Sequence, residues 1–286
     1  MISHGPCHKN IAPANTGAAA HRLTKEERDP TVIASNDDIP PCVTVIMAVS
    51  NEAATVLEMV RAVLRQRPVQ ELIVVDDAST DDTWPRLLTV QDARLRLLRQ
   101  AQNRGNRAAL RRAIALAHAP CIVIQDADLE YDPAEYHLLL RPMLMGKADV
   151  VYGSRFAGAG SRRVLSFWHP AGDRLLTLLS NMPTDLNLTH METCFKAVRR
   201  QILQGIEIEE DRFGVEPELT AKVARLQGIR IYEVPISYHG RGYSEGKKIC
   251  RRDGGSALRC ILRYNLMPKP AWSSVRWLRK AAGGKL

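Results

Sequence analysis

The sequence contains no pair of cysteines spaced as CxxC, and its six cysteines are scattered over 286 residues. Structural zinc sites and disulfide-rich scaffolds use closely and regularly spaced cysteines, so this spacing argues against both. Cys42 and Cys121 lie beside apolar runs that are typical of strands. The pattern favours buried or free thiols in a reducing cytoplasm.

Long apolar runs are also missing: none approaches the roughly 18 to 20 residues that a membrane-spanning helix needs. The N-terminus lacks the charged and then apolar pattern of a signal peptide. These absences predict a cytoplasmic protein that is neither secreted nor membrane-spanning. No internal repeat is visible, so a repeat architecture is not expected either.

Acidic residues are scarce in one part of the chain. Residues 241–286 hold 12 Lys and Arg against two acids, which gives +10, whereas residues 1–240 are close to neutral. A basic segment on a near-neutral body predicts an anionic partner, such as a membrane surface or phosphates. No nucleic-acid recognition motif accompanies this charge, so no nucleic-acid partner is expected.

The order of apolar and polar segments predicts three regions. Residues 1–39 show no periodicity and are expected to be a disordered tail, which ends just before Pro40 and Pro41. Residues 40–240 are expected to form the main folded domain, and residues 241–286 a basic loop and an amphipathic helical segment. Strands are predicted at residues 43–49, 71–75, 95–98, 121–125, 149–152, 194–198 and 230–234. Helices are predicted at residues 53–66, 82–91, 106–117, 133–145, 175–181, 215–225 and 253–266.

This alternation of strands and helices indicates an α/β fold with a mostly parallel sheet and helices on both of its faces. In such open sheets, ligands bind beyond the carboxyl ends of the strands. Residues that follow a predicted strand are therefore the first candidates for a site.

Asp126, Ala127 and Asp128 follow one of these strands. Two carboxylates separated by one residue are able to converge on a hard divalent cation, and Mg²⁺ or Mn²⁺ suits a site that also holds water and a diphosphate. The same spacing also occurs by chance, and acids before a helix often serve only as caps. On its own the motif is therefore a weak signal.

Asp76 and Asp77 follow another strand at the same predicted sheet edge. Two adjacent acids repel each other unless donors are near, which favours a role on the ribose or base of a nucleotide. The residues after them, 79–81, are better explained as the start of the next helix.

Three strings occur in order: VTVIMAVSNE at residues 43–52, DDASTDDT at 76–83 and QDAD at 125–128. Together with VYGSRF at 151–156, METCFK at 191–196 and the loop at 241–248, they resemble the family 2 glycosyltransferases of the GT-A fold. The resemblance is greatest to those like dolichyl-phosphate mannosyltransferase and bacterial polyprenyl-phosphate sugar transferases. It covers roughly residues 41–266.

The resemblance implies an enzyme that moves a sugar from a UDP- or GDP-linked donor to a polyprenyl phosphate, with inversion, at a peripheral position on the inner face of the membrane. It assigns Asp126 and Asp128 to the metal on the donor diphosphate and suggests Glu130 as a third ligand. Donor binding would fall to a larger set, namely Ala48, Ser50, Glu52, Asp76, Asp77, Ala127, Arg241, Lys247 and Lys248.

The resemblance also places Arg155 at the acceptor phosphate, with Arg162, Arg163 and Arg174 near it. A phosphate monoester is already ionised at neutral pH, so it attacks without a dedicated base. A hydroxyl acceptor would instead need a carboxylate base, for which the candidates are Asp185, Glu216 and Glu218. For the last two, an alternative is a purely structural role at a helix start.

Some positions depart from the family pattern. Ala48 and Ser50 stand where Pro and an aromatic residue are usual, Asn106-Arg107 replace Lys-Gly, and His190 stands where Asp is usual. Two further hypotheses therefore stay open: transfer to a soluble hydroxyl acceptor, and a weakly catalytic nucleotide-sugar-binding protein. A homo-oligomer is compatible with the sequence.

The segment at residues 253–266 has apolar residues at helical spacing, and Trp272 and Trp277 follow it. This pattern suits a helix that lies at a membrane interface. A helix packed on the catalytic domain shows the same stripe, so both interpretations stand.

Overall fold

The computed structural model describes residues 35–158, 163–164, 167–210, 214–241 and 251–266, and all that follows concerns these residues. Among them, the side chains of residues 106–107 and 251–253 are not described. All of them belong to one compact unit. The described strands form a seven-stranded sheet in the order β3-β2-β1-β4-β6-β5-β7.

The strands are β1 (Val43–Val49), β2 (Val69–Asp76), β3 (Leu95–Arg99), β4 (Cys121–Ile124), β5 (Val150–Ser154), β6 (Lys196–Arg199) and β7 (Ile231–Pro235). The helices are α1 (Val56–Leu64), α2 (Thr83–Leu87), α3 (Asn106–Leu116), α4 (Tyr136–Leu144), α5 (Trp168–Thr184), α6 (Arg200–Gly205), α7 (Val215–Ala224) and α8 (Arg251–Leu266), with short 3-10 turns η1 (Asn36–Asp38) and η2 (Pro133–Glu135).

The predicted α/β class with a mostly parallel sheet is confirmed. β1 pairs in parallel with β2 and β4, β2 with β3, and β5 with β7. β6 runs antiparallel to both β4 and β5. Because β6 reverses direction between them, β4 and β5 point the same way, and the ends of β1, β2, β4 and β5 reach one edge of the sheet.

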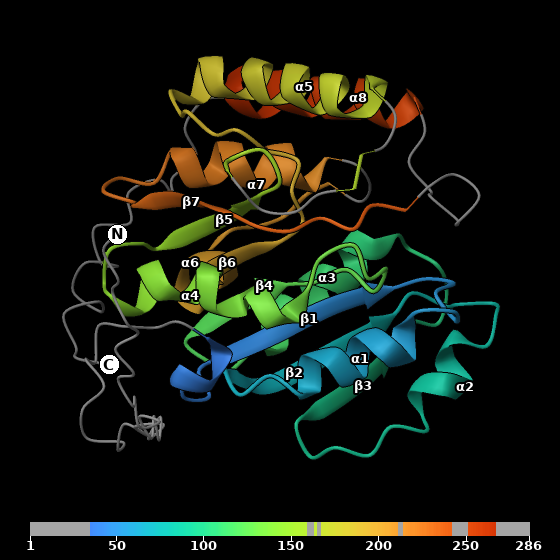
Figure 1. Cartoon of the computed structure of the whole chain (residues 1–286). Coiled ribbons are helices and arrows are strands. Elements are labelled where there is room, and N and C mark those ends of the chain that lie inside the picture. Colours follow the sequence, from blue (N-terminus) through green and yellow to red (C-terminus); the bar gives the residue numbers. More distant parts are fainter. Residues whose placement is uncertain (1–34, 159–162, 165–166, 211–213, 242–250, 267–286) are drawn as a thin grey trace, which may run out of the picture. The chain divides into compact units, whose positions relative to one another are not determined.

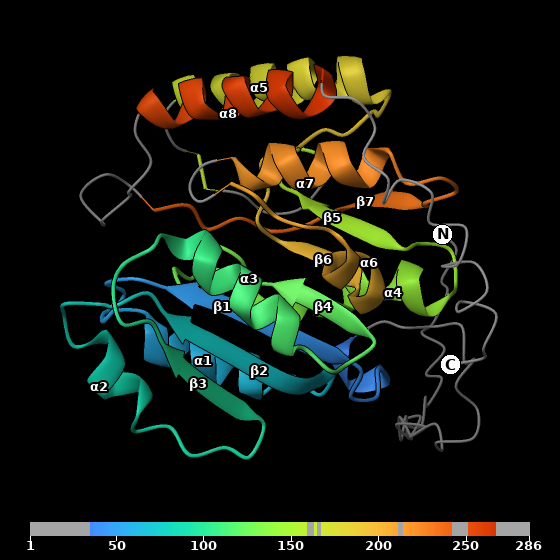
Figure 2. The same ribbon diagram turned by 180° about the vertical axis from the view of Figure 1, so that it is seen from behind.

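Strand residues alternate between two apolar layers because successive side chains point to opposite faces. Val45 and Met47 pack with α1 and α4, whereas Ile46 packs with α3, α6 and α7. Figure 1 shows α1 and α4, and the view from behind in Figure 2 shows α3 and α6. The sheet is therefore covered on both faces, which explains the continuous apolar run from Leu72 to Val75 in β2.

The folded unit begins earlier than the boundary predicted at residue 40. Ser35 and Asp38 close a capping box around η1, and Ile39 is fully buried. Asn36 Nδ2 donates to Pro133 O at 3.0 Å, which ties this turn to η2. The last five residues of the predicted tail thus belong to the domain.

The predicted helix start after Asp132 is confirmed, because η2 begins at Pro133 and leads into α4. Asp132 accepts a hydrogen bond from Ala134 N at 2.9 Å, as an N-cap should. Glu135 does not complete a capping box; its carboxylate accepts from Ser237 N at 2.9 and 3.1 Å. This contact fastens the chain after β7 to the segment that follows the Asp126-Ala127-Asp128 motif.

The cysteines in the described ranges are free, as predicted, namely Cys42, Cys121, Cys194 and Cys260. Burial raises the pKa of Cys121 to about 11, which keeps this thiol protonated and unreactive. Cys7 and Cys250 lie outside the described residues.

Helices α5 and α8 lie side by side, and both contact α7 (Figures 1 and 2). In α8, one face is buried and holds Ala257, Cys260, Ile261 and Tyr264. The predicted helix at 253–266 is confirmed and is packed on the domain. None of the helices in the described part of the chain combines the length and the apolar character that crossing a membrane requires.

Candidate functional site

Three loops that leave the same sheet edge contain a non-glycine residue with left-handed backbone. These residues are Asn51 after β1 (φ 52°), Ala78 after β2 (φ 54°) and Leu129 after β4 (φ 63°). Such a conformation is uncommon for residues with a Cβ and is found preferentially at functional sites. This edge of the sheet is therefore the candidate functional site.

Hydrogen bonds from backbone amides to side-chain oxygens tie the loops after β1 and β2 together. Asn51 N donates to Ser79 Oγ at 3.0 Å, and Thr80 N donates to Asn51 Oδ1 at 2.8 Å. Glu52 N donates to Thr83 Oγ1 at 2.8 Å. These hydrogen bonds fix Glu52 beside the end of β2. The predicted binding segments after β1 and β2 therefore lie next to each other.

Asp76 and Asp77 are fully buried at the end of β2. Asp76 pairs with Arg99 Nε at 3.1 Å, and Asp77 Oδ1 accepts from Gln100 Nε2 at 2.8 Å and Arg104 N at 2.9 Å. These are the donors that two adjacent acids require. Asp76 Oδ1 and Asp77 Oδ2 nevertheless have no hydrogen-bond partner among the described residues.

An unmatched carboxylate oxygen in the interior costs on the order of 1–3 kcal/mol or more. A group that donates hydrogen bonds, such as a ribose hydroxyl or a base N–H, would remove that cost at either acid. Asp76 and Asp77 thus each keep one acceptor oxygen without a hydrogen-bond partner among the described residues.

The Asp126-Ala127-Asp128 motif forms the loop after β4, with Ala127 buried and both acids half-buried. Gln125 shapes this loop because its Nε2 donates to Asp126 O at 3.1 Å and to Tyr131 O at 3.3 Å. Burial, followed by the charges of Asp126 and Glu130, raises the pKa of Asp128 to about 8. The loop thus holds three acidic side chains close enough together to raise the pKa of Asp128.

Glu130 was predicted as a third metal ligand, and the structure gives it another role. Its carboxylate accepts from Tyr238 OH at 2.8 Å and from Arg241 N at 2.8 Å. The described ranges contain no group of three His, Cys, Asp or Glu residues that could hold a metal ion. Glu130 as a third ligand stays a prediction, and its observed contacts anchor the chain that follows β7.

Arg241 joins residues that are far apart in the sequence. It contacts Glu52 Oε2 at 3.4 Å and Asp128 Oδ2 at 3.5 Å, beside its backbone bond to Glu130. The structure thus brings together the predicted residues of three segments. Lys247, Lys248 and Arg162 lie outside the described residues.

Arg155 follows β5 and lies within the same assembly. Its guanidinium stacks on the ring of Tyr238 at 4.3 Å and near that of Phe156 at 5.2 Å, and it pairs with Asp173 of α5. The guanidinium of Arg174 also lies over the ring of Phe156, 5.0 Å from the ring centroid. Tyr238 therefore connects Arg155 to Glu130, and through it to the acidic loop.

Two other predicted positions contact Tyr238 or Phe156, the aromatic residues beside Arg155. Arg163 donates to Gly240 O at 3.3 Å, close to Arg241 in the chain. His190 is buried edge-on against Phe156 at 5.0 Å. Burial, followed by the positive charges of Arg155 and Lys196, holds the pKa of His190 well below its usual value. The histidine is therefore neutral where an acid was expected.

The three candidate bases differ in their surroundings. Glu216 lies in the first turn of α7, is 8% exposed, and accepts from Cys194 Sγ at 3.7 Å. Glu218 is fully buried and accepts from Lys222 Nζ at 2.6 Å. It also accepts from two backbone amides, so it serves the fold and is not available as a base. Asp185 is exposed at the C-cap of α5.

Ala48 and Ser50 are the remaining described residues that were predicted to bind the donor. Ala48 is half-buried and packs in the layer under α3. Ser50 Oγ accepts from Asn103 Nδ2 at 3.5 Å. α3 begins at Asn106, as predicted, but the side chains of Asn106 and Arg107 are outside the description.

Sequence reasoning missed Tyr238, Asp173 and Gln100. Asp173 lies 18 residues after Arg155, and no spacing rule connects the two. Tyr238 stands three residues before Arg241, but a single tyrosine after a strand carries no signal. Each of the three contacts exists only because the sheet brings separate segments to one edge.

Comparison with known proteins agrees with this geometry. The family model "Glycosyl transferase family 2" matches residues 44–206. An undecaprenyl-phosphate mannosyltransferase of Micrococcus luteus is 31% identical over 73% of this chain and 87% of its own length. A dolichol-phosphate mannosyltransferase of Pyrococcus furiosus is 24% identical over 62% of this chain, which spans only 50% of that relative.

Among solved structures, glucosyl-3-phosphoglycerate synthase from Mycobacterium tuberculosis, in complex with Mn²⁺, UDP and phosphoglyceric acid, has a TM-score of 0.62 at 22% identity. The match covers 80% of each chain and shows that the fold is of the GT-A type. The chain is thus a glycosyltransferase, and it belongs to glycosyl transferase family 2.

Proposed function

We propose that this glycosyltransferase moves a sugar from a nucleotide-diphosphate donor to a polyprenyl phosphate. The observation that carries the proposal is the chain of contacts from Asp128 through Arg241, Glu130 and Tyr238 to Arg155. It puts an acidic loop suited to a metal–diphosphate and an arginine suited to a phosphate on either side of a single tyrosine. One site thus has places for a donor and for an anionic acceptor.

The donor side rests on Asp76, Asp77 and Glu52. The unmatched oxygens of the two aspartates suit the donor groups of a nucleoside. Glu52 is held against Arg241 at 3.4 Å. Arg241 would then stabilise the nucleotide diphosphate as negative charge develops on it, which is where positioned cations contribute most to rate.

The acidic loop fits a divalent cation. Asp126 and Asp128 would supply oxygen ligands, and a bound cation would offset the burial and the neighbouring acids that raise the pKa of Asp128. Mg²⁺ and Mn²⁺ take a small number of protein carboxylates and complete their shell with phosphate and water oxygens. Such an ion, when bound, neutralises the diphosphate that leaves the sugar.

The acceptor side rests on Arg155, with Arg174 beside it across Phe156. In the reaction, a phosphate oxygen of the acceptor attacks the anomeric carbon of the sugar. The bond from that carbon to the donor diphosphate breaks, and the nucleotide diphosphate leaves with the electron pair. The configuration is inverted by this direct displacement, and no base is needed because the phosphate is already ionised.

The relatives' names support this acceptor class, since two of them are polyprenyl-phosphate or dolichol-phosphate mannosyltransferases. The unavailability of Glu218 supports it as well, because it removes one of the bases that a hydroxyl acceptor would need. The position of Arg155 between Asp173 and two aromatic rings suits the recognition of a single anionic group.

The test is an assay of UDP- and GDP-linked sugars with Mn²⁺ or Mg²⁺, with and without a polyprenyl phosphate. Turnover only with the lipid supports the proposal. Turnover with a soluble hydroxyl or a small phosphorylated acceptor in its place would refute it, and metal-dependent donor binding without turnover would show a non-catalytic relative.

Asp126→Asn and Asp128→Asn test the cation separately. Each is expected to lower metal-dependent turnover by at least about a hundredfold while the free energy of unfolding stays within about 1 kcal/mol of the native value. Isothermal titration with Mn²⁺ and a nucleoside diphosphate gives the second measurement. Unchanged activity in both variants would contradict the assignment of the motif.

A further inference from the structure

Gln100 follows β3 directly and contacts one of the two acids at the end of β2. Its side-chain Nε2 donates to Asp77 Oδ1 at 2.8 Å, and the backbone N–H of Arg104 donates to the same oxygen at 2.9 Å. The other oxygen of this carboxylate, Oδ2, has no hydrogen-bond partner among the described residues. The two oxygens of Asp77 are therefore in different surroundings, one with two donors and one with none.

The backbone holds both residues of this contact in place. Gln100 N donates to Asp76 O at 2.8 Å, which extends the pairing of β3 with β2 by one residue. Asp77 N donates to Val49 O at 2.8 Å, at the end of β1. Side chains that are fixed by neighbouring strands define a direction more closely than side chains on free loops do. The bond from Gln100 therefore sets the orientation of the Asp77 carboxylate.

The preceding acid, Asp76, is held in a different way. Its Oδ2 pairs with Arg99 Nε at 3.1 Å and accepts from Ser79 N at 3.3 Å, while its Oδ1 has no partner among the described residues. Arg99 also donates to Ser79 O at 3.0 Å, and its guanidinium lies 5.4 Å from the centroid of the Trp84 ring. Two consecutive residues, Arg99 and Gln100, thus each hold one of two consecutive acids.

The two acids differ in the charge of these partners. Arg99 is a cation beside Asp76, whereas both hydrogen bonds that Asp77 accepts come from uncharged groups, an amide side chain and a backbone N–H. A hydrogen bond to an ionised carboxylate is roughly twice as strong as one between neutral groups. A carboxylate that shares no cation keeps its full charge for such a bond. Oδ2 of Asp77 therefore suits a ligand group that donates an N–H or an O–H.

Asp77 also has a structural task, which is to close the loop of residues 100–105 between β3 and α3. Its Oδ1 contacts both ends of this loop, through Gln100 and Arg104. Inside the loop, Asn103 Oδ1 accepts from Gly105 N at 3.2 Å, and Gly105 has a φ of 87°. This task uses Oδ1 alone. It does not explain a second oxygen that is buried without a donor, which is rare in folded proteins.

We propose that Gln100 is a positioning residue for the nucleotide: it holds Oδ1 of Asp77 and thereby presents Oδ2 to a donor group of the nucleoside. That group is an N–H of the base or a hydroxyl of the ribose. A carboxylate that is held at one oxygen does not turn freely about its Cβ–Cγ bond, so the ligand meets an acceptor that is already oriented. The inference rests on the proposed function in one respect, because it takes the ligand to be the nucleotide part of the donor.

The test is isothermal titration of the full chain with UDP or GDP in the presence of Mn²⁺, and with Mn²⁺ and pyrophosphate as a probe without a nucleoside. Gln100→Leu removes the donor and nearly keeps the size of the side chain. We expect its nucleotide affinity to fall about three- to tenfold, because Asp77 keeps only the bond from Arg104. Its pyrophosphate affinity should stay unchanged.

Gln100→Glu is the second variant, and it places another acceptor against Asp77 Oδ1. Since two carboxylates then face each other, nucleotide affinity should fall at least about tenfold, again without a change for pyrophosphate. Gln70→Leu is the matched control, because Gln70 is an exposed glutamine at the opposite end of β2. It should leave both affinities native. Native nucleotide affinity in both Gln100 variants would overturn the proposal, and so would an equal loss for pyrophosphate.

Asp77→Asn separates the positioning role from the structural one. The asparagine keeps an oxygen for Gln100 and Arg104 and replaces the Oδ2 acceptor with an NH₂ group. We expect nucleotide affinity to fall at least about tenfold while the unfolding midpoint stays close to native. In this background, Gln100→Leu should have no further effect, because residue 100 acts through the acceptor that is gone. Additive losses would refute the positioning role.

The 2′,3′-dideoxy form of the nucleotide identifies the group that Oδ2 accepts from. If the effect of Gln100→Leu disappears with this ligand, the contact is to a ribose hydroxyl. If the effect persists in full, the contact is to an N–H of the base. Both results support the role of Gln100, and they differ only in the part of the nucleoside that it serves.

Steady-state kinetics separate this inference from the proposed function. If both are correct, Gln100→Leu raises the KM of the nucleotide sugar and leaves kcat and the KM of the polyprenyl phosphate unchanged. If the titrations follow the expected pattern but no sugar reaches the lipid, the proposed function fails and the role of Gln100 stands. If the lipid is glycosylated and both Gln100 variants keep the native donor KM, the role of Gln100 fails and the proposed function stands.

Discussion

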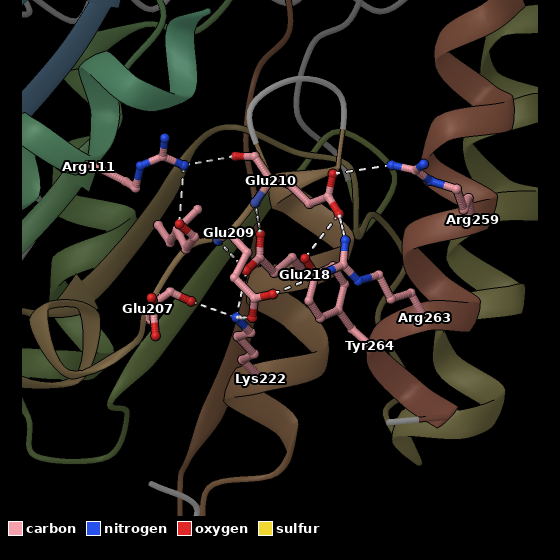
Figure 3. A network of polar contacts seen from close by, with 10 residues as sticks. Arg111, Glu207, Glu209, Glu210, Glu218, Lys222, Arg259, Arg263 and Tyr264 are labelled. Atoms are coloured by element: carbon pink, nitrogen blue, oxygen red, sulfur yellow. Dashed lines mark hydrogen bonds and ion pairs between the residues drawn. The ribbon is translucent and has the colours of Figure 1, made fainter. Parts of the chain in front are cut away.

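Glu218 offers the sharpest test of how the domain holds α8 in place. Its carboxylate is fully buried and accepts from Glu209 N at 2.7 Å, Glu210 N at 2.9 Å and Lys222 Nζ at 2.6 Å (Figure 3). Replacing Glu218 with Ala removes all three hydrogen bonds at once. Lys222 keeps its bonds to Glu207 O at 2.6 Å and Glu209 Oε1 at 2.7 Å, so its ammonium is not left alone.

The magnitude follows from these partners. Each orphaned backbone amide costs about 1–3 kcal/mol, and breaking a buried ion pair costs about 3–5 kcal/mol. These costs overlap because they concern one carboxylate, and Lys222 keeps two other acceptors. We therefore expect the Glu218→Ala variant to lose about 4 kcal/mol of unfolding free energy, a large share of the 5–15 kcal/mol that is typical of a domain.

Equilibrium urea unfolding, followed by circular dichroism, measures this loss. Glu207→Ala is the control, since Glu207 is an exposed acid of the same segment that contributes its backbone carbonyl to Lys222. That variant should stay within about 0.5 kcal/mol of the native protein. A Glu218→Ala variant that is as stable as its control would refute the reasoning, because it would show that the buried amides find other partners.

Two further predictions concern other charged groups. Burial raises the pKa of Asp149, but hydrogen bonds from Arg230 and Arg199 lower it by more, so the folded pKa lies below its usual value. The ionised Asp149 therefore stabilises the folded state at pH values above its unfolded pKa of about 3.9. This contribution is lost as the pH falls through the lower folded pKa. Asp149→Ala should therefore cost about 2 kcal/mol at pH 7, discounted for the half-exposed Arg230, and the difference in denaturant midpoint should shrink in acid. Arg155→Ala should raise the KM of a phosphate acceptor at least about tenfold and leave that of the donor unchanged. An equal rise in the KM values of the acceptor and the donor would show that Arg155 does not act on the acceptor.

Local patterns predicted the strands well because they are set by residues near one another, whereas α6 was missed and α5 begins earlier than predicted. The alternation of apolar runs with polar, helix-forming stretches placed each strand within a few residues of its observed bounds. The positions of Asp76, Asp77, Asp126 and Asp128 after strands then followed, since parallel strands share an edge for their carboxyl ends. The antiparallel direction of β6 was not visible, because pairing direction depends on partners far away in the chain.

The candidate site could be predicted as a set of residue types, and less well as a set of contacts. Glu130 lies two residues after Asp128 and seemed able to join it at a metal, yet it binds Tyr238 and Arg241 from another segment. Glu218 at a helix start seemed free to act as a base, yet two backbone amides and a lysine claim it. The sequence does not indicate which distant hydrogen-bond donor a given carboxylate contacts in the folded chain.

The basic C-terminal segment also separates features that the sequence determines from features that only the tertiary structure decides. The sequence by itself determined the α/β class, the acidic loop after β4 and a helix with an apolar stripe at residues 253–266, because each is a matter of residue type and spacing. Only the tertiary structure decided that α8 pairs with α5 and turns leucines outward while Arg263 and Tyr264 hold it to Glu210. The reason is that a helical pattern defines which residues share a face, whereas the choice of face to bury depends on the ion pairs and packing that other segments supply.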